Sequence, residues 1–214
     1  MSDDPTRGLI LGRIRDVLGR RPEPAAVAHE RIARGYTQEA TLSADARVAL
    51  FIERLEHYQV GVHRCPRTAV ATTIAATLAA RGKSRMLIPP DINPAWLASR
   101  SEFVPDAGLS YQQLDASDGV LTGCSLAIAN TGTLVLRHAA GEGRRALTLI
   151  PDYHLCVVFD EQVVQTVPEA LRQLAQWQPA LVTTISGPSA TADIEMTRIR
   201  GVHGPRTLDV IVVA

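Results

Sequence analysis

The sequence has few cysteines, and no two of them are close neighbours. Cys65, Cys124 and Cys156 are far apart in the chain, and no CxxC pair occurs. The chain therefore cannot supply by itself the four thiolates that hold an iron–sulfur cluster or a structural zinc ion. An odd, scattered set also argues against a disulfide framework, so we expect reduced and buried thiols.

Lysine is nearly absent, and neither sign of charge is in excess. The 22 basic residues include a single lysine, Lys83, and 22 acidic residues balance them. The arginines are spread along the chain without a cluster. Because binding to nucleic acid needs a basic excess on one face, we expect no nucleic-acid partner.

The chain also lacks a long hydrophobic run. It begins with the acidic pair Asp3 and Asp4 where a signal peptide would be basic, and no apolar segment follows. The longest uncharged stretch, Gly119–Leu136, approaches the length of a membrane span, but hydroxyl and amide side chains interrupt it around Gly132. The pattern predicts no membrane span and a cytoplasmic protein.

Residues 1–42 are predicted to form an N-terminal arm. Apolar residues in Thr6–Gly19 recur at helical spacing, which predicts a short amphipathic helix. The segment Arg20–Pro24 breaks this helix, and a polar stretch follows to about Thr41. We expect the stretch to be a linker, or an arm laid over the domain or over a neighbouring subunit. Because it offers little apolar surface, we expect the arm to be dispensable for folding of residues 43–214.

From residue 43 onward, helical and strand patterns alternate. We expect helices over 43–59, 68–80 and 168–176, a short helical turn after Pro94, and strands over 60–64, 86–88, 155–159, 181–185 and 208–213. Leu126–Leu136 is predicted to be a hairpin that turns at Asn130, Thr131 and Gly132. Short apolar strands separated by helices indicate a sheet covered on both faces, hence an α/β domain.

A glycine-containing segment matches the residue pattern of the dinucleotide fingerprint GxGxxA. It runs from Gly141 to Ala146, and Asp160 follows at the end of a predicted strand. The mechanism needs a helix whose N-terminus faces the pyrophosphate. Too few residues separate Gly143 from Pro151 to form that helix. We therefore interpret the segment as a flexible glycine loop between two strands and expect no dinucleotide cofactor.

The same loop contains two adjacent arginines. Guanidinium groups beside glycines can grip a carboxylate or phosphate through two hydrogen bonds. Arg144 and Arg145 are therefore candidate ligand-binding residues. Ordinary salt bridges at the surface are the alternative.

The segment Ser186–Glu195 is the strongest local signal for a site. It follows a predicted strand and is expected to open a helix. Loops at the carboxyl ends of strands are where open α/β sheets bind ligands. Its glycine, hydroxyl and carboxylate residues are candidates for binding a ligand: Gly187, Ser189, Thr191, Asp193 and Glu195. The two carboxylates either complement the helix dipole or point into a cleft.

Histidines give weaker signals. Asp193, Glu195 and His203 could be drawn as a metal site, but no motif fixes their geometry, so we assign no metal. His203 is expected in a turn before the last strand. His154 enters a predicted strand and is expected to be a hydrogen-bonded core histidine.

Three segments that occur in this order resemble the lactate-utilisation (LUD) domain family: Ala127–Thr133, Gly143–Pro151, and Ser186–Glu195 with Gly201–Pro205. The resemblance covers about residues 45–214. It implies a three-layer α/β/α sandwich with a mostly parallel sheet plus a hairpin, similar to CoA transferases and sugar-phosphate isomerases. It also implies a role in bacterial oxidation of L-lactate to pyruvate, beside partner proteins that carry iron–sulfur clusters.

One residue departs from the family's pattern. The family has Glu where this chain has Asn130, just before Thr131 and Gly132. An amide cannot act as a carboxylate nucleophile or general base. This difference weakens the case for acyl transfer and affects a binding or scaffolding role less. Asn130, Thr131 and Gly132 are therefore candidate ligand-binding residues.

These observations favour a component of a lactate-utilisation system that has no cluster of its own. Oxidation of a 2-hydroxy acid removes two electrons and requires a redox cofactor. Since the sequence has no cluster or dinucleotide motif, we expect no cofactor on this chain. The expected partners are iron–sulfur proteins and a small anionic ligand. The alternatives are a stand-alone enzyme acting on a CoA ester, sugar phosphate or folate, and a ligand-binding or scaffold protein; a homo-oligomer also stays open.

Overall fold

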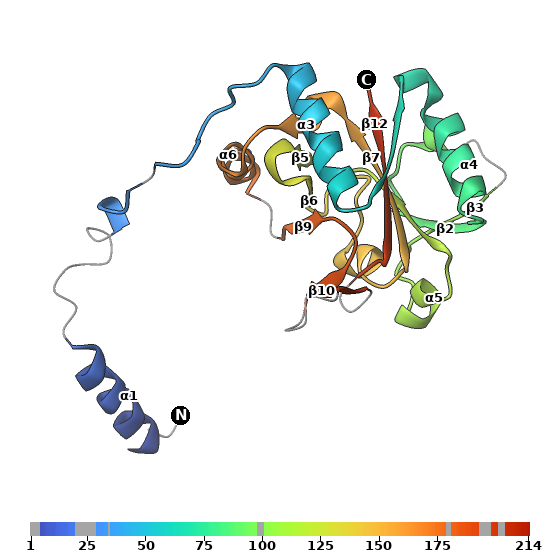
Figure 1. The fold of residues 1–214 in the computed structure, drawn as a ribbon. Helices are drawn as coiled ribbons and strands as arrows, with labels where there is room; N and C mark the ends of the chain where they lie inside the picture. Colours follow the sequence, from blue (N-terminus) through green and yellow to red (C-terminus); the bar gives the residue numbers. More distant parts are fainter. Residues whose placement is uncertain are drawn as a thin grey trace. The chain divides into compact units, whose positions relative to one another are not determined.

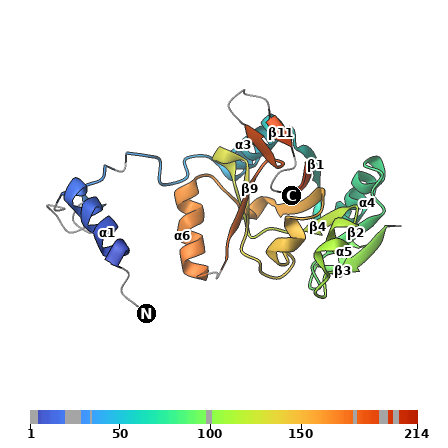
Figure 2. The ribbon, with the colours of Figure 1, turned by 90° about the horizontal axis from the view of Figure 1, so that it is seen from below.

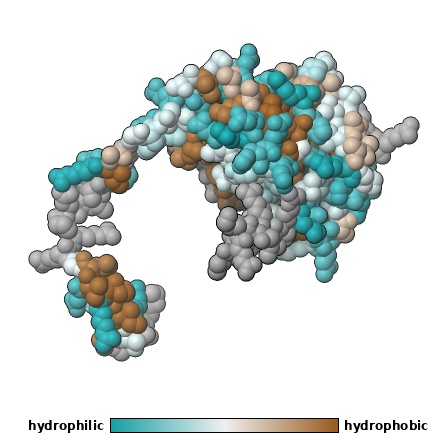
Figure 3. Space-filling model, in the orientation of Figure 1, coloured by the Kyte–Doolittle hydropathy of each residue, from teal (hydrophilic) through white to brown (hydrophobic). Residues whose placement is uncertain are grey.

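The computed structural model describes residues 5–19, 29–33, 35–97, 101–178, 181–192, 198–200 and 204–214. The chain divides into two compact units, Met1–Tyr36 and Thr37–Ala214. The first contains the helix α1 (Pro5–Leu18), whose apolar side chains Leu9, Ile10, Ile14, Val17 and Leu18 are exposed. They form the brown surface of this helix in Figure 3. None of the described helices is both long enough and apolar enough to cross a membrane.

The second unit is an α/β domain built on a parallel sheet of six strands in the order β1-β12-β7-β4-β2-β3. The strands are β1 (Gly61–Cys65), β2 (Arg85–Ile88), β3 (Glu102–Pro105), β4 (Gly119–Thr122), β7 (Tyr153–Phe159) and β12 (Thr207–Val213). The last strand of the chain thus lies in the interior of the sheet, between β1 and β7. Nearly continuous apolar runs in β7 and β12 match this position, since both faces of these strands are buried.

A second, mixed sheet has the order β8-β5-β6-β9. Its strands are β5 (Leu126–Ile128), β6 (Thr133–Leu136), β8 (Val163–Val164) and β9 (Thr183–Ser186). The predicted hairpin is confirmed: β5 and β6 pair antiparallel through the turn η3 (Ala129–Thr131), and Gly132 has a φ of 58°. Gly132 must be small, because a Cβ there would lie 2.8 Å from Cβ of Arg54.

Helices cover both faces of the main sheet, as predicted. Figure 1 shows α4 (Val70–Ala80) on one side of β7 and β12, and α3 (Ala44–His57) with the second sheet on the other. The helix α6 (Val167–Trp177) packs on the outer side of the second sheet, so it lies far from α4 in Figure 2. Shorter helices are α5 (Tyr111–Asp115), η1 (Arg67–Ala69), η2 (Pro94–Trp96), η4 (Arg145–Thr148) and η5 (Asp160–Gln162).

Local sequence signals account for where the main helices begin. Ser43 caps α3, because its hydroxyl accepts a hydrogen bond from the amide of Ala46 at 3.3 Å. Thr166 and Glu169 form a reciprocal capping box at the start of α6. In α3 the side chains of Val48, Phe51 and Leu55 recur at helical spacing and are buried against the second sheet and β12.

The expected helix after Ser189 is wrong where the structure describes it. Residues Ala190–Ala192 form the strand β10, which pairs antiparallel with β11 (Arg198–Arg200). The backbone groups of β10 are satisfied by this partner strand instead of by a helical turn. Asp193, Glu195 and His203 lie outside the described residues.

A buried carboxylate joins the main sheet to α4. Asp209 on β12 is fully buried and accepts hydrogen bonds from Nε and Nη2 of Arg81 at 2.8 and 2.6 Å. It also accepts one from the hydroxyl of Tyr153 at 2.9 Å. Burial and the adjacent Asp209 raise the pKa of Tyr153, which keeps its hydroxyl protonated as the donor. A Cβ on Gly61 would lie 2.2 Å from Asp209 Oδ1, so only glycine fits there.

The substitution Asp209→Asn should lower the free energy of unfolding by about 2–3 kcal/mol. This loss of unfolding free energy is smaller than the usual cost of breaking a buried ion pair. The reason is that the Arg81 side chain is 44% exposed, so water partly replaces the carboxylate of Asp209. Urea denaturation measures the change. Asp152→Asn is the control, since its pair with Arg206 lies at the surface and should matter by under about 0.5 kcal/mol. Equal losses in the two variants would contradict this role for Asp209.

Residues 38–42 are bound to the domain. The amides of Thr41 and Leu42 donate to Oε1 of Gln165 at 2.7 and 2.9 Å. The carbonyl of Gln38 accepts a hydrogen bond from Arg172 at 2.6 Å. The last residues of the predicted arm 1–42 therefore contact the domain, so their removal should affect its stability.

A chain that begins at Thr37 should unfold at the urea midpoint of the full chain, because it keeps these hydrogen bonds. A chain that begins at Ser43 should lose about 1–3 kcal/mol, since the buried side chain of Gln165 is left without partners. Equal stability of the two shortened chains would show instead that residues 37–42 contribute nothing.

Candidate active site

The glycine-containing loop between β6 and β7 is organised around a buried carboxylate. Glu142 is 2% exposed, and its Oε2 accepts hydrogen bonds from the amides of Arg137 at 2.8 Å and Ala139 at 3.2 Å. Its Oε1 accepts a hydrogen bond from the hydroxyl of Ser125. The loop leads into the short helix η4, not into the longer helix that a dinucleotide fingerprint requires. Glu142 therefore holds the loop in a defined shape, which the expectation of a flexible loop did not include.

The two adjacent arginines of this loop have different surroundings. Arg144 binds Asp106 through Nε and Nη2 at 2.7 and 3.0 Å and also donates to the carbonyl of Leu109 at 2.5 Å. Burial raises the pKa of Asp106, but the hydrogen bonds from Arg144 and from the amide of Leu109 outweigh it, so the net pKa lies below its ordinary value. The guanidinium of Arg144 is thus engaged by groups of the protein itself.

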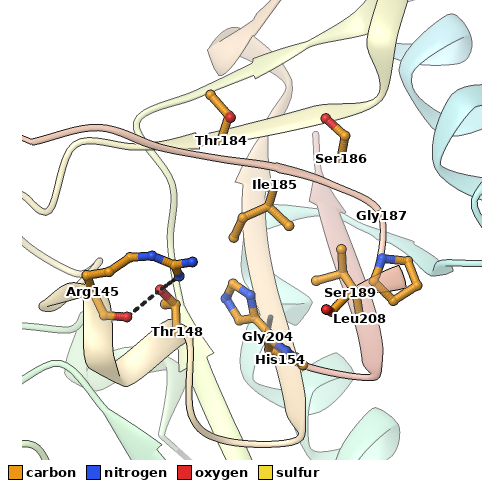
Figure 4. A pocket seen from close by; sticks show the side chains of 12 residues that line it. Arg145, Thr148, His154, Thr184, Ile185, Ser186, Gly187, Ser189, Gly204 and Leu208 are labelled. Atoms are coloured by element: carbon orange, nitrogen blue, oxygen red, sulfur yellow. Dashed lines mark hydrogen bonds between the residues drawn. The ribbon is translucent and has the colours of Figure 1, made fainter. Parts of the chain in front are cut away.

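Arg145 instead lines a cavity of about 270 Å³. Figure 4 shows its side chain reaching from η4 toward the cavity, opposite β9 and the Gly187–Ser189 turn. Its Nη1 has one long hydrogen bond, to Thr148 Oγ1 at 3.5 Å. Among the described residues no carboxylate forms a salt bridge with it. The cavity therefore presents a positive charge that this part of the chain does not neutralise.

His154 supplies a second polar group to the same cavity. It lies on β7 and is 1% exposed, and its Nε2 is hydrogen-bonded to Thr122 Oγ1 at 2.8 Å. Its Nδ1 has no hydrogen-bond partner among the described residues. A buried ring nitrogen normally has a partner, so Nδ1 is an exception within the described part of the chain. His154 was expected to be a hydrogen-bonded core residue; it is buried, but only one of its nitrogens is satisfied.

The Gly187–Ser189 turn forms the other wall of the cavity, together with Ser186, Gly204 and Leu208 (Figure 4). Gly187 has a φ of 79°, and a Cβ there would lie 2.8 Å from Tyr58. The amide of Ser189 donates to the carbonyl of Pro205 at 2.9 Å, which ties the turn to the segment before β12. The turn thus brings two of the predicted site residues, Gly187 and Ser189, to Arg145.

The remaining predicted site residues lie elsewhere or are only partly described. Asn130 is exposed and, with Thr131 and Gly132, does not line the cavity. A chain of hydroxyls at 2.7 Å spacing, Thr131–Thr133–Ser186, connects this turn to the cavity wall. Thr191 lies on β10, and its side chain is not described. Within the described ranges, no three His, Cys, Asp or Glu side chains come together as metal ligands.

The fold and these segments place the chain in a known class. A family model described as "LUD domain" matches residues 48–213, so the chain belongs to the LUD domain family. The family resemblance noted in the sequence is thereby confirmed.

Named relatives agree with this membership. "Lactate utilization protein C" from Deinococcus radiodurans is 42% identical over 183 residues, which cover 83% of this chain and 84% of the relative. A protein of the same name from Geobacillus thermodenitrificans is 26% identical and covers 97% of this chain and 98% of its own length. A crystal structure of a DUF162 family protein from D. radiodurans superposes with a TM-score of 0.71 and 37% identity, over 81% of this chain and 99% of that one.

The ion pair of Arg144 predicts a defined response to acid. Because the pKa of Asp106 is lowered in the folded state, the pair stabilises the protein above the ordinary pKa of 3.8 and is lost as the pH falls through the lowered value. In Arg144→Gln the hydrogen bond and the charge with which Arg144 lowers that pKa are lost, so the pKa rises and acid unfolding should begin at a higher pH. Circular dichroism along a pH titration measures this. Arg206→Gln, which removes an exposed pair, should leave the midpoint in place; a shift as large as that of Arg144→Gln would refute the assignment.

Proposed function

We propose that this chain is a cytoplasmic component of bacterial lactate utilisation that binds a small carboxylate, L-lactate or pyruvate, in the Arg145 cavity. The relatives named lactate utilization protein C support the process. The observation that supports the ligand class is the cavity itself, which Arg145 and His154 line; Nδ1 of His154 has no partner among the described residues.

The chemistry of the lining suits a 2-hydroxy or 2-keto acid. A guanidinium binds a carboxylate through paired hydrogen bonds. The imidazole of His154 would then meet the oxygen on the neighbouring carbon, because one ring nitrogen is already engaged by Thr122 and the other is not. A cavity of about 270 Å³ is at the small end of ligand sites, in keeping with an acid of few atoms.

Electron transfer is assigned to partners. Removing two electrons from a 2-hydroxy acid needs a redox cofactor, and this sequence has no cluster-binding cysteine motif. We infer that iron–sulfur partner proteins carry the electrons, while this chain handles the substrate. The alternative by fold analogy is acyl transfer through residue 130. That residue is Asn130, whose side chain is an amide, and it is exposed and lies outside the cavity.

Arg145→Gln should weaken binding of L-lactate or pyruvate about ten- to a hundredfold, because a charge-assisted contact worth about 1.5–3 kcal/mol is lost. Isothermal titration calorimetry on the full chain measures the affinity. The matched control is Arg85→Gln, which removes an arginine from the exposed pair with Glu102 on the far part of the main sheet. Unchanged affinity in Arg145→Gln, or no binding of either acid to the unaltered chain, would overturn the proposed site.

A further inference from the structure

A second cavity, also of about 270 Å³, lies at the carboxyl ends of β4 and β7. Its lining includes Trp96, Gly123, Cys124, Phe159 and Gln162. This is a different place from the Arg145 cavity, which lies toward the amino ends of β7 and β12, near His154 and Leu208. The distinctive group in the second cavity is the Cys124 thiol.

Cys124 has another cysteine beside it. The thiol of Cys156, which is fully buried, donates to the carbonyl of Gly123 at 3.6 Å, and Gly123 directly precedes Cys124. Both side chains belong to the same cluster of buried residues, and each thiol affects the pKa of the other. The register of β4 and β7 explains this proximity, because it pairs Cys156 with Thr122 on the neighbouring strand. Cys124 follows the end of β4, so the chain there is not held by the strand ladder.

The surroundings of the pair favour loss of one proton. The hydrogen bond with Cys124 lowers the pKa of Cys156 against the effect of burial, and His154 and Thr122 act in the same direction. The hydrogen bond with Cys156, and then burial, raise the pKa of Cys124. After the first proton has left, these directions leave the remaining proton on Cys124 and the thiolate on Cys156. Transfer of that proton to Cys156 puts the thiolate on Cys124, which lines the cavity.

We propose that Cys124 and Cys156 are a peroxide-oxidisable thiol pair, in which Cys124 reacts from the cavity and Cys156 closes an intramolecular disulfide. The first oxidant is hydrogen peroxide or another small hydroperoxide. Cys65 lies in a separate cluster on the other face of the main sheet and takes no part.

The reaction balances in two steps. The Cys124 thiolate attacks one peroxide oxygen, the O–O bond breaks, and the departing hydroxide takes up the proton from the pair to leave as water. Cys124 is now a sulfenic acid. The Cys156 thiolate attacks the Cys124 sulfur and the S–O bond breaks. The departing hydroxide takes back from solvent the proton that the pair lost first, and a second water leaves. Two thiols are oxidised to one disulfide and one peroxide is reduced to two waters.

The test treats the reduced full chain with hydrogen peroxide and follows it by intact mass and by alkylation of the remaining thiols. We expect a loss of two hydrogen atoms, about 2 Da. Peptide mapping should give a Cys124–Cys156 link, and only Cys65 should stay open to alkylation after denaturation. A disulfide that includes Cys65, a link between two chains, or oxidation of all three thiols to the same extent would overturn the proposal.

Single substitutions assign the order of the steps. In Cys156→Ser the sulfenic acid on Cys124 should persist and be captured by dimedone, whereas Cys124→Ser should give no adduct on Cys156. Cys65→Ser is the control and should form the disulfide as the unaltered chain does. Dimedone capture on Cys156 in Cys124→Ser at the rate seen for Cys124 would reverse the assignment. If either variant fails to fold, the mapping of the unaltered chain still decides whether the pair forms.

Discussion

The main sheet depends on one buried carboxylate, Asp209. It lies on an interior strand, and a charged group can be buried there only because Arg81 and Tyr153 donate to both of its oxygens. These partners come from the end of α4 and the start of β7, while the backbone of Gly61 on β1 leaves the space for it. Asp209 thereby fixes β1, β12, β7 and α4 with respect to one another. Both cavities lie on β7, so their places follow from this arrangement.

In this protein some residues stabilise the frame of the cavity, while their neighbours in the sequence line it. Glu142 and Arg144 use their charges inside the fold, and the loop that they hold leaves Arg145 at the cavity. On the opposite wall, Gly187 packs against Tyr58 so that Ser189 stands beside the segment before β12. Thr122 has a similar supporting position between the two cavities, because its hydroxyl contacts both His154 and Cys156. The site is thus built from few groups on a well-anchored frame.

Features set by neighbours in the sequence could be predicted from it. The cap at Ser43, the hairpin turn at Gly132 and the apolar run of β7 all depend on residues within a few positions. Features set by distant partners could not be predicted. Arg144 and Arg145 look alike in the sequence, and only Asp106, 38 positions away, separates their roles. Ala190–Ala192 were expected in a helix because their pairing with Arg198–Arg200 leaves no local signal. That Nδ1 of His154 has no partner among the described residues likewise depends on distant strands and could not be predicted.

The position of β12 has a consequence for synthesis of the chain. Until residues 207–213 have left the ribosome, β1 and β7 cannot acquire the strand that lies between them. From the synthesis of β7 until that of β12, the nascent chain carries two strands with open edges, and such edges pair readily with other chains. Asp209, which accepts the hydrogen bonds from Arg81 and Tyr153, is made at the same time because it lies on β12. Pairing of β1 and β7 with their common neighbour therefore waits until β12 has been made, and until then the open edges of both strands are exposed to other chains.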